Sequence, residues 1–101
     1  MPRETIGHIR ASPGWAGMLA LAHTLSHDLA LGNGGVVPVD RLANVEVPTL
    51  AMAGGASYGW AHEAVRTIAD AAPDAQARFV DGQHHAPAHE AVASIMKEFF
   101  A

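Results

Sequence analysis

Apolar residues recur along the first third of the chain at the spacing of a helix. After Ser12-Pro13, steps of three and four residues predict a helix with one apolar stripe, formed by Trp15, Met18, Leu19, Ala22, Leu25 and Leu29. Ser12 is the expected N-cap, with proline at the first helical position. A shorter helix is expected before it, with Ile6 and Ile9 as its apolar contacts. The glycine-rich run at 32–35 ends this helical part.

The second half of the chain predicts strands that alternate with helices. Pro48 introduces an apolar run at 49–55, which is typical of a strand buried on both faces. A helix is expected over 61–71, a second strand over 76–80 and a last helix over 88–100. The apolar faces of the two helices are Ala61, Ala64, Val65, Ile68 and Ala72, and Val92, Ile95, Met96, Phe99 and Phe100.

The order strand, helix, strand, helix predicts an α/β fold with parallel strands and a right-handed crossover. In parallel sheets, chemistry is found beyond the carboxyl ends of the strands. Two segments follow such ends, GGASYGW at 54–60 and DGQHHAPAH at 81–89. Candidate functional residues are therefore expected in these two turns.

Composition narrows the class of protein. The 101 residues are half hydrophobic, which fits one small packed domain and excludes wholesale disorder. A formal charge of −4 argues against non-specific nucleic-acid binding, which needs a basic face. The absence of cysteine excludes disulfides and thiolate chemistry. The start MPRETIGHIR lacks the apolar core of a signal peptide, and no apolar run is long enough to span a membrane. We expect a soluble, cytoplasmic protein.

From residue 47 onwards the chain resembles the C-terminal end of an α/β-hydrolase. The resemblance lies in VPTLAMAGG, then a helix, a strand, the sequence DGQHH and a closing helix that ends in FF. Residues 13–45 resemble the segment that links the cap to the last strands in some of these enzymes. The resemblance implies a truncated α/β-hydrolase-like C-terminal half, with cap-like helices and a linker at 1–46 and the β-α-β-α unit at 47–101.

The same resemblance implies a catalytic histidine. Gly82-Gln83 match the "GQ" of the family, which places the family's general base at His85. The turn after the preceding strand usually carries the triad acid, but here it holds no carboxylate, and Asp28 is the replacement that we propose. No G-x-S-x-G occurs, so the nucleophile of the family is not in this chain.

Other chemistry is less favoured by the pattern. His84, His85 and His89 could hold zinc, as could His23 and His27 beside Asp28, but Ala86-Pro87 favours a loop over a rigid pair of ligands. Ser57 is interpreted as an ordinary turn serine. The glycines fit neither phosphate-binding pattern. We therefore expect no metal and no cofactor.

Three functions remain open. One is an enzyme that hydrolyses a small ester, lactone or similar acyl substrate with His85 as base and a nucleophile from elsewhere. Another is a non-hydrolytic cyclase or binding protein for a small hydrophobic molecule, with a pocket lined by Trp15, His23, Trp60, His84 and His85. The third is an inactive oligomeric remnant. Two parallel strands leave exposed edges, so in every case we expect a homo-oligomer, such as a symmetric dimer with a continuous sheet.

Overall fold

The computed structural model describes all residues, 1–101, and divides into two compact units, Met1–Val36 and Val37–Ala101. The first unit contains helices α1 (Arg3–Ala11), α2 (Trp15–Leu21) and α3 (Leu25–Leu31), with short 3-10 turns at Ala22–Thr24 and Asn33–Gly35. The second contains α4 (Val39–Leu42), β1 (Thr49–Gly54), α5 (Gly59–Ala71), β2 (Ala75–Val80) and α6 (His89–Phe100). The predicted boundary after residue 46 lies further along the chain than the division between these units.

The first unit is helical where the apolar stripe predicts it, but the expected N-cap is wrong. Ser12 does not cap the following helix: it is the C-cap residue of α1, and its hydroxyl donates to the carbonyl of Ile9 at 2.7 Å. The residue before α2 is Gly14, which supplies no side-chain cap. The stripe also buries none of its members: Leu25 is 58% and Leu29 74% exposed. The helices of this unit follow one another without forming a core of their own.

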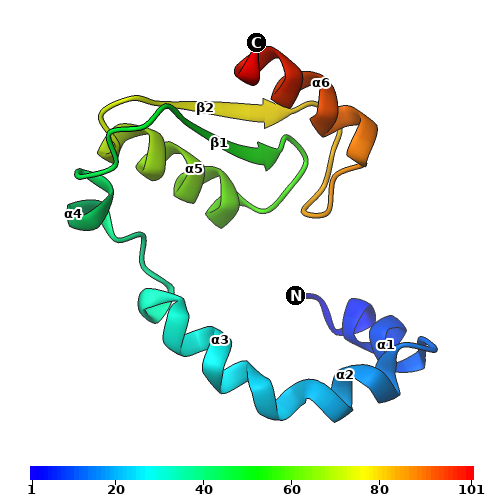
Figure 1. Cartoon of the computed structure of the whole chain (residues 1–101). Helices are drawn as coiled ribbons and strands as arrows, with labels where there is room; N and C mark the ends of the chain where they lie inside the picture. The colour runs from blue at the N-terminus through cyan, green and yellow to red at the C-terminus, as the bar shows by residue number, and fades with distance from the viewer. The chain divides into compact units, whose positions relative to one another are not determined.

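In the second unit the predicted strands and helices are confirmed. β1 and β2 pair in parallel, with Thr49 opposite Ala75 and Gly54 opposite Val80. Figure 1 shows α5 on one side of this two-stranded sheet and α6 on the other. Phe79 packs against α5, where its ring meets His62 edge-on at 5.1 Å. Successive strand residues face opposite sides, so Arg78 faces α6, where it pairs with Glu98 at 3.3 Å.

The core of this unit is small. Its buried apolar residues are Ala51, Ala61, Val65, Ala72 and Val80. The expectation that β1 is buried on both faces is wrong, because Leu50, Met52 and Ala53 are only half-buried. The expected inward face of α6 is also only partly correct, since Met96 is 43% and Phe100 76% exposed. Each strand has one neighbour, so the outer edges of β1 and β2 are unpaired. The homo-oligomer stays a prediction.

Candidate functional site

The turns that follow the two strands cross each other directly. Gly54 ends β1, and a Cβ atom at this position would overlap the backbone carbonyls of Gln83 and His84. Only a residue without a side chain allows this crossing. The sequence therefore places glycine where the loop that carries the paired histidines passes over the end of β1.

Backbone hydrogen bonds join the two turns. The amide of Gly55 donates to the carbonyl of Val80 at 2.8 Å, and the amide of Ala56 donates to the carbonyl of Gln83 at 2.9 Å. The side-chain oxygen of Gln83 accepts from the amide of Ala88 at 2.8 Å, which closes the loop before α6 begins. The loop that carries His85 is thus tied both to the neighbouring turn and to itself.

His62 fixes the end of β1 from the helix side. Its Nε2 lies 2.9 Å from the carbonyl oxygen of Gly54. A carbonyl oxygen only accepts hydrogen bonds, so this nitrogen must carry the proton. This role of His62 is not predicted by the sequence, because a position inside the predicted helix gives no sign that the side chain contacts the end of the strand. Its hydrogen bond to Gly54 stabilises the turn that carries the candidate site.

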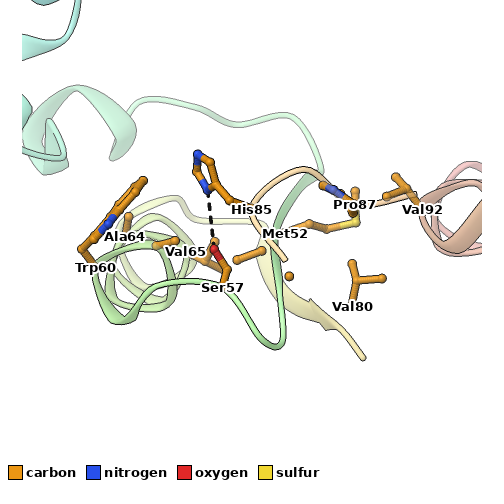
Figure 2. A pocket seen from close by; sticks show the side chains of 12 residues that line it. Met52, Ser57, Trp60, Ala64, Val65, Val80, His85, Pro87 and Val92 are labelled. Carbon is orange, nitrogen blue, oxygen red and sulfur yellow. Dashed lines mark hydrogen bonds between the residues drawn. The ribbon is translucent and has the colours of Figure 1, made fainter. Parts of the chain in front are cut away.

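His85 meets Ser57 at the mouth of the two turns. The Nδ1 atom of His85 lies 3.5 Å from the Oγ of Ser57, a long hydrogen-bond distance between residues 28 positions apart (Figure 2). Both residues come from strand-end turns, one after β1 and one after β2. The ring of His85 is exposed. The strand that precedes His85 is the one that the sequence predicts. The contact with Ser57 is not predicted, because the sequence indicates only an ordinary turn serine at that position.

Two aromatic rings, those of Tyr58 and Trp60, lie beside the imidazole of this pair. Tyr58 and Trp60 are stacked with centroids 5.9 Å apart and planes inclined by 11°. The imidazole of His85 lies 5.1 Å from Trp60 and 5.9 Å from Tyr58, tilted against both. Tyr58 and Trp60 are 51% and 60% exposed. Trp60 was expected to line a pocket; Tyr58 was not, although it lies in the same turn.

A pocket of about 390 Å³ opens beneath the rings. Its apolar wall includes Met52, Val65, Val80, Pro87 and Val92, with Trp60 at the rim (Figure 2). Apart from the indole, the polar side chains that line it are Ser57 and His85. A concave, mostly apolar pocket with a few convergent polar groups is the usual form of a small-molecule site.

The other predicted site residues are placed differently. The side chain of His84 does not line this pocket, although its backbone carbonyl takes part in the crossing over Gly54. Trp15, His23 and Asp28 belong to the first unit, and their assigned roles stay predictions. No carboxylate of the second unit pairs with His85.

No group of three or more histidine, aspartate or glutamate side chains could hold a metal ion, so neither histidine cluster is assembled for zinc. None of the helices is both long and apolar enough to cross a lipid bilayer.

Comparison with solved structures links the chain to a known fold. It is similar to an α/β hydrolase from Sphaerobacter thermophilus, with 36% sequence identity and a TM-score of 0.87 over 100% of this chain. The chain spans 39% of the length of that hydrolase. No protein-family model and no curated protein matches. The protein therefore has the fold of part of an α/β hydrolase.

Proposed function

We propose that the pocket carries out hydrolase-type acid–base chemistry on a small apolar acyl ester, with His85 as the general base. The supporting observation is the position of the imidazole: it lies at the rim of an apolar pocket, at the carboxyl end of β2, with Nδ1 facing Ser57. The similarity to an α/β hydrolase supports the same class of reaction.

The two ring nitrogens have different surroundings, and this defines the proposed role. Nδ1 faces the Ser57 hydroxyl, so Nε2 is the atom left for substrate. In the reaction, Nε2 takes a proton from the attacking oxygen as this oxygen bonds to the carbonyl carbon. The bond between the carbonyl carbon and the alcohol oxygen then breaks, and the same proton passes from Nε2 to the oxygen of the leaving alcohol. Imidazole suits both steps because the same ring nitrogen can accept a proton and then donate it.

The attacking oxygen comes from outside this chain. In the isolated protein water takes this part, and an added alcohol such as methanol replaces it. General-base catalysis of this kind contributes about 10²–10⁴-fold to a rate.

The pocket determines the class of substrate. A volume of about 390 Å³ fits a small molecule, and the apolar wall of Met52, Val65 and Val80 fits an unbranched acyl chain. The ring of Trp60, which is stacked on Tyr58, provides a flat surface in the pocket lining for the alcohol part of the ester. No group in the lining is charged apart from His85 when it is protonated, so a neutral ester is favoured over a phosphate or a carboxylate.

Hydrolysis of p-nitrophenyl butyrate by the purified full chain tests the proposal. We expect release of p-nitrophenol faster than in an equal concentration of free imidazole, and a fall of about 100-fold in that excess rate for His85→Ala. Added methanol should yield methyl butyrate with the same dependence on His85. The matched control is His89→Ala, which removes an exposed histidine at the first position of α6. Equal rates for the wild-type protein and His85→Ala would refute the proposal.

A further inference from the structure

We infer that Ser57 is a positioning residue for His85: its hydroxyl accepts the proton on Nδ1 and thereby keeps Nε2 unprotonated for substrate. The inference rests on the proposed function, because it assigns a partner to the base of that site. Its basis is the approach of Ser57 Oγ to Nδ1, at 3.5 Å, and not to Nε2.

The backbone around Ser57 is held in place from several sides. The amide of Ser57 donates to the carbonyl of Gly54 at 3.0 Å, and the same carbonyl accepts from Nε2 of His62 at 2.9 Å. In the same turn, the amide of Ala56 donates to the carbonyl of Gln83, two residues before His85. One connected set of hydrogen bonds therefore holds the backbone of the two turns that carry Ser57 and His85.

The contact fits an orienting role better than a nucleophilic one. A serine nucleophile gives its proton to the nitrogen that also faces substrate, whereas the opposite nitrogen is held by the orienting group. Ser57 occupies the second of these positions. The nucleophile of a hydrolase elbow sits on a sharp, strained turn; Ser57 has no such strain, since Asn33 is the one non-glycine residue with a positive φ.

The group that orients His85 is neutral, and this determines how far the rate should fall when its hydroxyl is removed. The groups that face His85 are the hydroxyl of Ser57 and the rings of Tyr58 and Trp60, and none of them is a carboxylate. A neutral acceptor selects the tautomer but does not stabilise the imidazolium as a carboxylate does. Loss of the hydroxyl should therefore lower the rate by about 10-fold, much less than loss of the imidazole.

The test combines ¹⁵N NMR of the histidine rings with pH–rate profiles for p-nitrophenyl butyrate. Among the signals of the seven histidines, those of His85 are identified as the ones missing from the spectrum of His85→Ala. In the wild-type protein we expect the proton of neutral His85 on Nδ1. Ser57→Ala should shift the ring towards the tautomer mixture of free histidine and lower the rate about 10-fold, while Ser57→Thr, which keeps the hydroxyl, should restore both.

A carboxylate at position 57 provides a second, independent variant. Ser57→Asp should move the acid limb of the pH–rate profile to higher pH by about one unit, because an opposite charge at this distance favours the imidazolium. The control is Ser94→Asp, at an exposed serine of α6 whose hydroxyl faces the carbonyl of Ala91 in its own helix. That variant should leave both the tautomer and the profile unchanged.

Two results would overturn the inference. One is an unchanged tautomer of His85 in Ser57→Ala. The other is covalent labelling of Ser57 by a fluorophosphonate, detected by mass spectrometry of the peptide, which would make Ser57 the nucleophile. If the wild-type protein shows no esterase activity, the proposed function fails by itself, while the NMR measurement still tests the contact between Ser57 and His85.

Discussion

Replacing Gly54 by alanine tests whether the crossing of the two strand-end turns holds the site together. The added Cβ would overlap the carbonyl oxygens of Gln83 and His84 and would lie 2.8 Å from the carbonyl carbon of Gln83. These are backbone atoms, so no side-chain rotation relieves the overlap. The loop that carries His85 must move away from the end of β1, or β1 must shift in the sheet.

The expected magnitude follows from the contacts that such a shift would break. Overpacking costs about 1–3 kcal/mol. Moving the loop also strains the bonds from Ala56 to Gln83 and from His62 to Gly54, each worth about 1 kcal/mol. The total is about 3–5 kcal/mol. A unit of about 65 residues has a free energy of unfolding of only about 3–10 kcal/mol, so Gly54→Ala should remove much or all of the folded population.

The assay is urea unfolding followed by Trp60 fluorescence in a Trp15→Phe background, so that the signal comes from the second unit. The control is Gly59→Ala, at the first position of α5, where an added Cβ meets nothing within 4 Å. We expect this control to be as stable as the parent or more stable by up to about 1 kcal/mol. A loss below about 1 kcal/mol in Gly54→Ala would show that the crossing is not tight in solution, and the placement of His85 beside Ser57 would lose its support.

Two further substitutions separate the core of the second unit from its surface. Val65 lies on the face of α5 that packs against the sheet and is 6% exposed, so Val65→Ala should lower the free energy of unfolding by about 2 kcal/mol in the same assay. Val39 is 45% exposed, so Val39→Ala should lower it by less than about 0.5 kcal/mol. Equal effects of the two substitutions would contradict the assigned core. The ion pair of Arg78 with Glu98 joins side chains that are 40% and 68% exposed. Arg78→Met should therefore change the free energy of unfolding by less than about 0.5 kcal/mol, both in 0.1 M and in 1 M NaCl. A salt-dependent loss above about 1 kcal/mol would show that charge holds α6 on the sheet.

Much of the architecture could be predicted because it depends on local pattern. The apolar run closed by Gly54-Gly55 predicts β1, the 3.6-residue spacing of Ala61, Val65 and Ile68 predicts α5, and the connection between the strands requires them to be parallel. The position of His85 after a strand end follows from the same order. The degree of burial does not follow from the local pattern, because it depends on what covers each face. The leucines of α3 are exposed in their own unit, and Phe100 of α6 is 76% exposed.

The sequence by itself thus determined the order of strands and helices and the two turns that follow the strands, and the role of His85 in one of these turns stays a prediction. Only the tertiary structure decided which group faces that histidine. The register of β1 and β2 puts their carboxyl ends side by side, and this joins Ser57, Tyr58 and Trp60 of one turn to His85 of the other. A local pattern extends over a few residues, whereas this contact spans 28 positions and exists because the strands pair in parallel and Gly54 lets the two turns cross.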